Sequence, residues 1–174
     1  MRKILSGLLS TLIAVSTPAS AALKVGDKAP DFVTTGALAG KPFKLRLSSE
    51  LKKGPVVLYF FPKAFTAGCT AEANAFSEAI GEFKKAGAQV IGLSADGLPT
   101  LKKFSVEACR SAFPVATATP ATQKAYDVAW AERPGLTTRT SYVIDRRGRI
   151  VAVHDDRDWR KHVATTLAAA RALK

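Results

Sequence analysis

Residues 60–70 read Phe60-Phe61-Pro62-Lys63-Ala64-Phe65-Thr66-Ala67-Gly68-Cys69-Thr70. Phe60 and Phe61 end an apolar run that begins at Pro55. After Cys69, apolar residues recur every three or four positions. This order predicts a buried strand, a loop and then a cysteine at the start of a helix. The first turn of a helix offers unpaired backbone N–H groups and the positive end of the helix dipole, and both favour a thiolate. The stretch therefore predicts that Cys69 is a nucleophile.

Two residues of the loop support this interpretation. Thr66 lies three positions before Cys69 and can place a hydroxyl beside the sulfur, while Pro62 can brace the loop. The alternative is a buried, inert cysteine with Thr66 serving only as the N-cap of the helix. The loop residues by themselves leave both alternatives open.

Working outward, the pattern of apolar residues indicates a single α/β domain. The sequence predicts short strands and turns within 22–51, strands at 55–61, 89–94, 141–144 and 150–153, and helices at 69–87, 99–111, 122–126 and 159–170. The first strand is apolar throughout, which is typical of a central strand covered on both faces. Strands that alternate with helices and end in a hairpin plus a helix predict a three-layer α/β/α domain around a central mixed sheet.

The N-terminus has the features of a secretory signal peptide. Arg2 and Lys3 give a basic start, residues 4–15 form an apolar stretch too short to span a bilayer, and small residues end at Ala21. We therefore predict a signal peptide over 1–21, a domain over 22–174, and a periplasmic or secreted location without a stable membrane anchor. An anchor that stays attached is the alternative.

Composition narrows the classes of function. The chain carries a formal net charge of +12, but its basic residues are scattered and no aromatic stacking pattern accompanies them. Because of this, and because an exported protein rarely meets nucleic acid, we expect a solvated surface and no nucleic-acid partner. Cys69 and Cys109 are too far apart for a Cys-x-x-Cys site, and neither lies near His154 or His162 in sequence. We therefore expect no metal site and no cofactor.

Pro62, Thr66 and Cys69 form the pattern Pro-x-x-x-Thr-x-x-Cys, which resembles the active-site signature of the peroxiredoxins. The string from Phe61 to Ala73 is most similar to the branch called bacterioferritin comigratory protein, or peroxiredoxin Q. Further similar segments lie at 26–32, 90–94 and 139–145, so the resemblance covers nearly all of the mature chain. It implies a thioredoxin fold and a thiol-dependent peroxidase of hydrogen peroxide, with organic hydroperoxides as further candidate substrates.

The resemblance also implies a role for each residue of the site. Cys69 would attack the peroxide and become a sulfenic acid, Thr66 would hydrogen-bond the peroxide and the thiolate, and Pro62 would shield the sulfur. Arg139 matches the family's active-site arginine, and Glu72 matches an acidic position that orients it. From the residues alone, Arg139 can equally be a surface residue, and Glu72 can simply complement the helix dipole.

The sequence departs from the usual pattern of the branch at the second cysteine. Many members carry it five residues after the first, where this chain has Asn74, so a disulfide within the helix is impossible. Cys109 is the remaining candidate for the resolving cysteine, and local unwinding would have to bring the two Cα atoms within about 7 Å. The alternatives are a packed, uninvolved Cys109 beside a one-cysteine peroxidase, and a non-catalytic thioredoxin-fold module with a structural disulfide.

The peroxidase interpretation implies two partners. They are the peroxide and an unidentified thiol or thioredoxin-like reductant that returns Cys69 to its reduced state. The exported location makes the usual cytosolic thioredoxin an improbable donor. We expect the protein to act as a monomer.

Overall fold

The computed structural model describes residues 22–173, so the predicted signal peptide over 1–21 lies outside the described residues. Within this range the strands form one seven-stranded mixed sheet in the order β2-β1-β5-β4-β3-β6-β7. The strands are β1 Val33–Leu38, β2 Lys41–Arg46, β3 Val56–Phe60, β4 Gln89–Ser94, β5 Val115–Thr117, β6 Thr140–Ile144 and β7 Ile150–Asp155. The helices are α1 Leu47–Leu51, α2 Ala67–Lys85, α3 Leu98–Glu107, α4 Pro120–Ala125, the short 3₁₀ helix η1 Trp159–Lys161 and α5 His162–Arg171.

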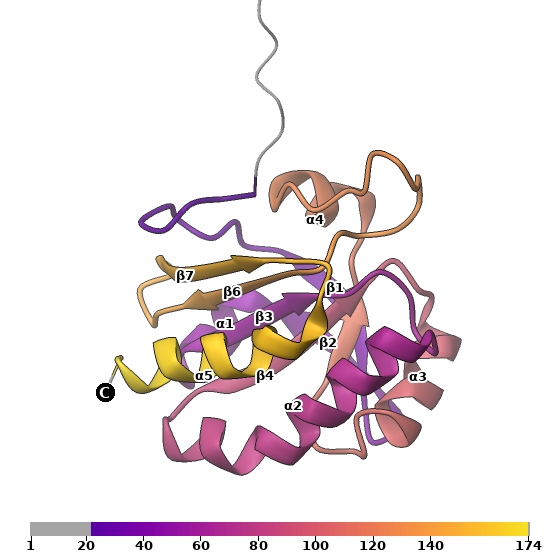
Figure 1. Ribbon diagram of the computed structural model, residues 1–174, viewed down its shortest axis with the longest axis horizontal. Helices are drawn as coiled ribbons and strands as arrows, with labels where there is room; N and C mark the ends of the chain where they lie inside the picture. Colours follow the sequence, from indigo (N-terminus) through magenta and orange to yellow (C-terminus); the bar gives the residue numbers. More distant parts are fainter. Residues whose placement is uncertain (1–21, 174) are drawn as a thin grey trace, which may run out of the picture.

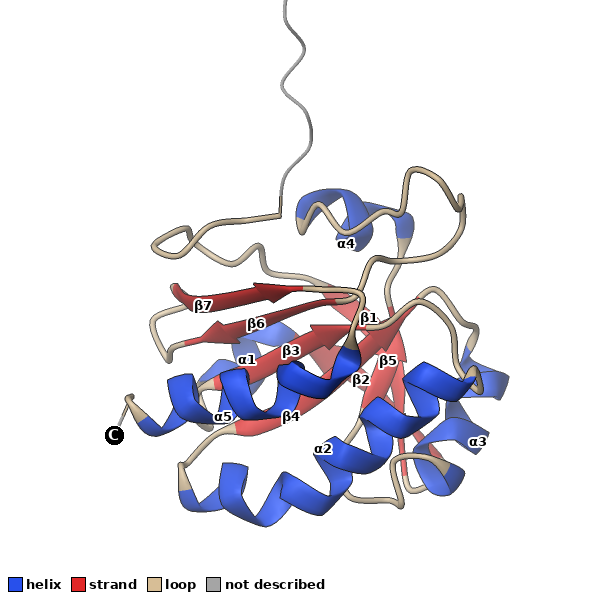
Figure 2. Ribbon diagram, viewed as in Figure 1, coloured by secondary structure: helices blue, strands red, loops and turns tan. Residues whose placement is uncertain are grey.

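Helices cover both faces of the sheet, as the pattern predicted. In the view of Figure 1, α2, α3 and α5 lie in front of the sheet and α1 lies behind it. Figure 2 shows the same arrangement with helices and strands distinguished. No helix among residues 22–173 combines the length and the apolar character needed to cross a membrane. The predicted three-layer α/β/α architecture with a mixed sheet is confirmed.

Strand β3 occupies the centre and divides the core in two. It pairs in parallel with β4 and antiparallel with β6, and all five of its residues are buried. Because successive side chains of a strand point to opposite faces, Val57 and Tyr59 join the core under α2, α3 and α5, whereas Val56 and Leu58 join the core on the other face. The central position follows from its continuous apolar run, which only a strand covered on both faces can bury.

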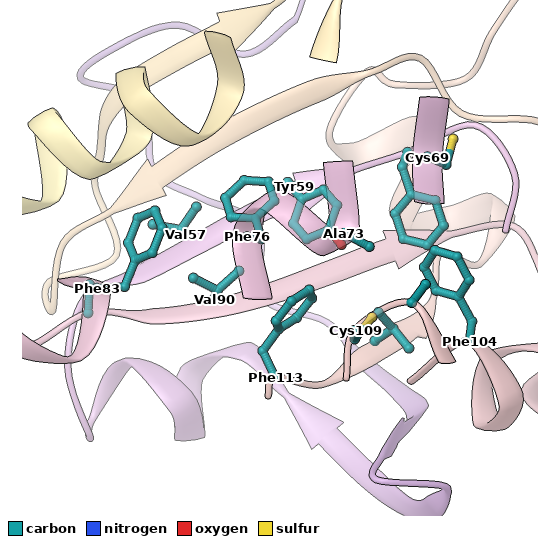
Figure 3. Packing of buried hydrophobic residues seen from close by; sticks show 14 of the residues in the cluster. Val57, Tyr59, Cys69, Ala73, Phe76, Phe83, Val90, Phe104, Cys109 and Phe113 are labelled. Atoms are coloured by element: carbon teal, nitrogen blue, oxygen red, sulfur yellow. The ribbon is translucent and has the colours of Figure 1, made fainter. Parts of the chain in front are cut away.

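Tyr59 anchors the aromatic packing beneath α2. Its ring stacks on Phe76 of α2 with centroids 4.4 Å apart, and both belong to the cluster shown in Figure 3. The neighbouring strand makes room for this ring, because a Cβ placed on Gly92 would lie 2.8 Å from it. A residue larger than glycine at this position would displace the ring or the strand.

Several boundaries differ from the sequence-based expectation. Strand β5 and helix α1 were not predicted, since a three-residue strand and a five-residue helix carry too little periodicity to detect. Helix α3 ends at Glu107 instead of continuing to 111, so Cys109 follows the helix rather than lying in its last turn. The chain leaves the helix through Arg110 and Ser111, whose φ angles of 49° and 59° are incompatible with a right-handed helix.

Candidate active site

The loop after β3 delivers Cys69 to the first turn of α2. Thr66 holds the N-cap position with extended backbone angles, and the N–H of Thr70 donates to the carbonyl of Thr66 across 2.9 Å. Cys69 is therefore the third residue of the helix, where backbone N–H groups have no partner within the helix. Its side chain is only 1 % exposed. The sulfur lies at the positive end of a helix of 19 residues.

Arg139, far away in sequence, lies against this sulfur. One guanidinium nitrogen, Nη2, is 3.4 Å from Sγ of Cys69, and the other, Nη1, donates to Oε2 of Glu72. Its Nε donates to the carbonyl oxygen of Arg157 at 3.0 Å. Arg139 is only 8 % exposed and Glu72 is fully buried. The structure therefore brings together a thiol, a guanidinium and a carboxyl group in surroundings that exclude most water.

Burial changes the titration of both charged partners. It raises the pKa of Glu72 to about 8, although the charge and hydrogen bond of Arg139 act in the opposite direction. For Arg139, burial works against the charged form, but the negative charges of Glu72 and Cys69 outweigh it and raise the pKa of the guanidinium. Arg139 therefore keeps its positive charge beside the sulfur at any physiological pH.

Thr66 and Pro62 lie at the entrance of the site. The hydroxyl of Thr66 donates to the carbonyl of Lys63 at 3.0 Å and makes no capping hydrogen bond to the helix. This bond uses the hydroxyl proton, so the lone pairs of Oγ1 are left to accept a proton from a ligand. Pro62 is half-buried and Thr66 is exposed. Both are therefore more accessible to solvent than Cys69, which is buried.

The loop is held by a residue that the sequence analysis missed. Asp96, which follows β4, accepts hydrogen bonds at 2.8 Å from the backbone N–H of Ala64 and from the hydroxyl of Ser94. The loop also contains Phe65 at a φ of 64°, a left-handed conformation that costs about 1 kcal/mol or more in a residue other than glycine. Asp96 lies 32 positions from Ala64, so no local sequence signal could have identified it.

A second missed feature is a buried pair of polar residues behind Arg139. Oγ of Ser141 lies 2.7 Å from Nδ1 of His162, and both side chains are fully buried. Oε1 of Glu72 approaches the same Nδ1 to 3.7 Å. A hydrolase triad needs the serine and the acid on opposite ring nitrogens and a serine that substrate can reach, so this group is not one.

A pocket of about 540 Å³ opens beside the site. Its walls include Pro62, Trp130, Glu132, Arg139, Asp156 and Arg157. The guanidinium groups of Arg133 and Arg157 lie 5.0 and 5.1 Å from the ring centre of Trp130. A pocket of this size accommodates ligands much larger than hydrogen peroxide.

Cys109 lies in the same core as Cys69 but in different surroundings (Figure 3). It is fully buried, and burial raises the pKa of its thiol with no charged group to oppose the effect. Both cysteines are free thiols. The structure thus places Cys109 at the end of α3 without bonding it to Cys69.

Comparison with known proteins agrees with this geometry. The sequence profile described as the AhpC/TSA family matches residues 25–153. The chain belongs to this family, the peroxiredoxins, which are thiol-dependent peroxidases with a peroxide substrate and a thiol reductant.

Within the family, the similarities point to the peroxiredoxin Q and bacterioferritin comigratory protein branch. The chloroplastic peroxiredoxin Q of Sedum lineare is 33 % identical over 136 residues, which cover 78 % of this chain and 72 % of that protein. The crystal structure of peroxidoxin BcpB from Mycobacterium tuberculosis has a TM-score of 0.78 and 31 % identity, covering 87 % of this chain and 99 % of the other. Peroxiredoxin Q of Xanthomonas campestris has a TM-score of 0.69 and 28 % identity, covering 79 % and 89 %. The resemblance inferred from the sequence is confirmed.

Proposed function

We propose that Cys69 is the thiolate that attacks the peroxide and that Cys109 resolves the sulfenic acid formed on it. The observation that carries the first part is the guanidinium of Arg139, 3.4 Å from Sγ at the start of α2. A fixed positive charge and the end of a helix dipole both stabilise a thiolate in a site that is largely dry. The sulfur then has the charge that nucleophilic attack requires.

In the proposed reaction the thiolate attacks one peroxide oxygen, a sulfur–oxygen bond forms and the oxygen–oxygen bond breaks. The departing oxygen leaves with negative charge and takes up a proton, which gives water or an alcohol. Arg139 and the free N–H of Cys69 stabilise this developing charge, since donors aimed at a leaving oxygen contribute most where water is excluded. Oγ1 of Thr66 accepts a hydrogen bond from the O–H of the peroxide, and Pro62 limits the access of water.

Glu72 is proposed to orient Arg139. The three hydrogen-bonding groups of the guanidinium contact Glu72, Cys69 and the carbonyl of Arg157, and these contacts fix both its plane and its direction. A preorganised charge needs no rearrangement when the oxygen–oxygen bond breaks. A lysine at the same place would offer a single point of charge and could not make the same set of contacts.

For resolution, the Cys109 thiol condenses with the Cys69 sulfenic acid, forms a disulfide and releases water. Both side chains are buried, so the segment around Cys109 has to open first. Two features favour opening there. Helix α3 ends two residues earlier, and Arg110 and Ser111 hold strained left-handed angles that opening relieves.

We also propose that organic hydroperoxides are substrates and that the protein is exported. The pocket beside Pro62 and Arg139 supports the first, because it has room for the organic part of such a molecule. The leader-like residues 1–21 support cleavage after Ala21 and a periplasmic or secreted location, and several relatives of this chain are chloroplastic. The reductant is then a thiol protein of that compartment.

Intact mass of the reduced protein before and after one equivalent of hydrogen peroxide tests the proposal. The wild type should lose two hydrogens, Cys69→Ser should not change, and Cys109→Ser should gain one oxygen that a sulfenic acid reagent captures. Oxygen addition to the wild type without a disulfide would remove Cys109 from the mechanism. No reaction of the wild type would overturn the role of Cys69.

A further inference from the structure

A cluster of buried polar side chains lies behind Arg139, away from the pocket. Its titratable and charged members include Cys69 and Glu72 of α2, Arg139 before β6, the half-buried His154 of β7 and His162 of α5. The phenol of Tyr59 and the carboxylate of Asp156 lie close enough to interact with them electrostatically. Ser141 of β6 adds a neutral hydroxyl, and the ring of His154 packs edge-on against His162 with centroids 4.5 Å apart. The role proposed for Cys69 uses Arg139 and Glu72 but not the histidines.

One oxygen of Glu72 has no hydrogen-bond partner in the described part of the chain. Oε2 accepts from Arg139, but Oε1 is buried and unpaired, and its neighbour is Nδ1 of His162 at 3.7 Å. Leaving a buried polar atom unpaired costs about 1–3 kcal/mol, and more when the atom carries charge. An ionised Glu72 therefore pays a penalty at this oxygen that a protonated Glu72 can avoid.

The partners of His162 fix which of its nitrogens carries a proton. Nε2 lies 2.9 Å from the carbonyl oxygen of Asp156, which only accepts, so Nε2 is the donor. Burial also lowers the pKa of His162 to about 4, which keeps the ring neutral. Nδ1 is then an acceptor with a single lone pair, to which the hydroxyl of Ser141 donates at 2.7 Å, and a proton on Oε1 of Glu72, now 3.7 Å away, would have to share that lone pair in a three-centre bond. Two acceptors face each other unless Glu72 carries a proton.

The net charge of the cluster also favours a protonated Glu72. Arg139 contributes one positive charge and contacts two acids, Cys69 and Glu72. If both acids ionise, the buried group has an excess negative charge, which is costly in an apolar environment. If only one ionises, the group is neutral. The cluster therefore favours one proton shared between the sulfur and the carboxyl group.

We propose that Glu72 takes up the proton that Cys69 gives up, so that the thiolate coexists with a neutral carboxylic acid whose Oε1–H faces Nδ1 of His162. His162 is the positioning residue that stabilises this acid, Ser141 competes for the same nitrogen, and a shift of roughly half an ångström or more brings Oε1 within hydrogen-bond distance of Nδ1. The step is Cys69–SH plus Glu72–COO⁻ giving Cys69–S⁻ plus Glu72–COOH. With Glu72 neutral, the charge of Arg139 acts on the sulfur alone.

The return of this proton rests on the role of Cys69 proposed above. When the thiolate attacks ROOH, Cys69–S⁻, ROOH and Glu72–COOH become Cys69–SOH, ROH and Glu72–COO⁻. Atoms and charge balance, because the alkoxide gains the proton that the carboxylic acid loses. The cluster is neutral before and after the reaction, so no charge has to be buried during turnover.

Infrared difference spectroscopy of the reduced full-length protein at about pH 7 tests the proton on Glu72 directly. We expect the carbonyl band of a protonated carboxylic acid in the wild type, its loss in Glu72→Gln, and its loss in Cys69→Ala, where Arg139 pairs with an ionised Glu72. Absence of a band that Glu72→Gln removes, or its persistence in Cys69→Ala, would overturn the proposal. This readout needs no peroxide, so it is separate from the test of the peroxidase role.

The rate of Cys69 alkylation by iodoacetamide tests the positioning role. Loss of the acceptor in His162→Leu should lower the rate about fivefold, the equivalent of one hydrogen bond worth about 1 kcal/mol. Glu72→Gln removes the group that takes up the proton, so His162→Leu should lower the rate when residue 72 is Glu but cause no further loss when it is Gln. His154→Gln is the matched control, because it touches His162 but not Glu72.

The opposite pattern would contradict the inference. If His162 acts independently of a proton on Glu72, His162→Leu lowers the alkylation rate by the same factor whether residue 72 is Glu or Gln. If His162→Leu does not fold, Ser141→Ala removes the donor that competes for Nδ1, so it should keep or raise the rate and keep the infrared band. A lower rate in Ser141→Ala together with loss of the band would also reject the positioning role.

Discussion

The two cysteines of this chain are almost equally buried, with 1 % and 0 % of Cys69 and Cys109 exposed, yet their surroundings are opposite. Cys69 lies at the positive N-terminal end of α2 and contacts Arg139. Cys109 follows the C-terminal end of α3, where the helix dipole is negative, and packs among aromatic side chains. Burial alone therefore does not decide the reactivity of a thiol, because the charges that remain inside the core decide it.

The two cysteines also differ in what surrounds them: apolar packing around Cys109 and paired charges around Cys69. Around Cys109, aromatic rings such as Phe104 and Phe113 fill space without polar groups. Around Cys69, each buried charge requires a partner, and the chain supplies it from distant elements. Polar surroundings of this kind fix one geometry. Near Cys109, the left-handed residues Arg110 and Ser111 favour local opening. A rigid site suits the attacking role proposed for Cys69, and a segment that can open suits the resolving role proposed for Cys109.

The largest effect on peroxidase activity should come from replacing Cys69, the cysteine beside Arg139. Cys69→Ser should lower peroxidase activity by more than about 10³-fold, because an alcohol at this position is not ionised and cannot replace a thiolate nucleophile. Consumption of hydrogen peroxide with excess dithiothreitol measures it. Cys109→Ser serves as the control, since dithiothreitol can replace the resolving thiol, and it should keep most of the activity. Equal losses in the two variants would abolish the distinction between the cysteines.

Replacing the guanidinium beside Cys69 by an ammonium group keeps the positive charge but removes its directed hydrogen bonds. Arg139→Lys should lower kcat/KM for hydrogen peroxide about 10²-fold, because lysine cannot contact Cys69, Glu72 and the Arg157 carbonyl together. Stopped-flow oxidation of the reduced protein measures it, with Arg46→Lys as the control at an exposed ion pair. A lysine variant with wild-type kinetics would show that directed hydrogen bonding by the guanidinium is not needed.

The sequence predicted helix α2, which carries Cys69, but not all of the residues that surround this cysteine. The apolar run, the helical periodicity and the loop motif are local, and they predicted β3, β4 and α2 closely. The contact of Arg139 with Glu72 joins positions 67 residues apart, and only a family resemblance suggested it. The contact of Ser141 with His162 had no such signal, because the family-like segment 139–145 says nothing about the partner of Ser141, His162 belongs to no motif, and both side chains are buried.

The end of α3 shows a different limit of sequence reasoning. The apolar spacing of Leu101, Phe104 and Ala108 continues past the helix, so periodicity predicted helix up to Ser111. The structure instead turns at Arg110 and buries Cys109 in a loop. Residues that pack on one face of a helix can continue to pack after it ends, so burial periodicity alone does not locate a helix terminus.

Labelling should separate the two thiols in the native protein. Cys69 is expected to react with iodoacetamide about thirtyfold faster than Cys109, because Cys109 needs local opening and has a pKa raised by burial. Mass spectrometry of peptides from briefly labelled protein gives both rates. In urea the two rates should become similar, which controls for differences in local sequence. Similar rates under native conditions would mean that the core around Cys109 is already open.

The smallest expected effect is on stability at alkaline pH. Burial raises the pKa of Cys109 in the folded protein, whereas the unfolded thiol titrates near its ordinary value of about 8.5. Above that pH the unfolded chain binds fewer protons than the folded one, so stability falls as pH rises, by up to about 1.4 kcal/mol per pH unit. The stabilising contribution is complete below about pH 8.5, and the buried tyrosines, which titrate near pH 10 when unfolded, add to the loss only above that value.

Urea unfolding between about pH 8 and 10, in a Cys69→Ser background that removes the other thiol, isolates this contribution. Adding Cys109→Ala should flatten the dependence on pH, although the lost side-chain volume lowers stability by a constant amount at every pH. The slope, and not the absolute stability, is therefore the quantity that distinguishes the thiol of Cys109 from its packing. The same slope with and without Cys109 would mean that this thiol already reaches solvent in the folded state, and the contrast between the two cysteines would then rest on Arg139 alone.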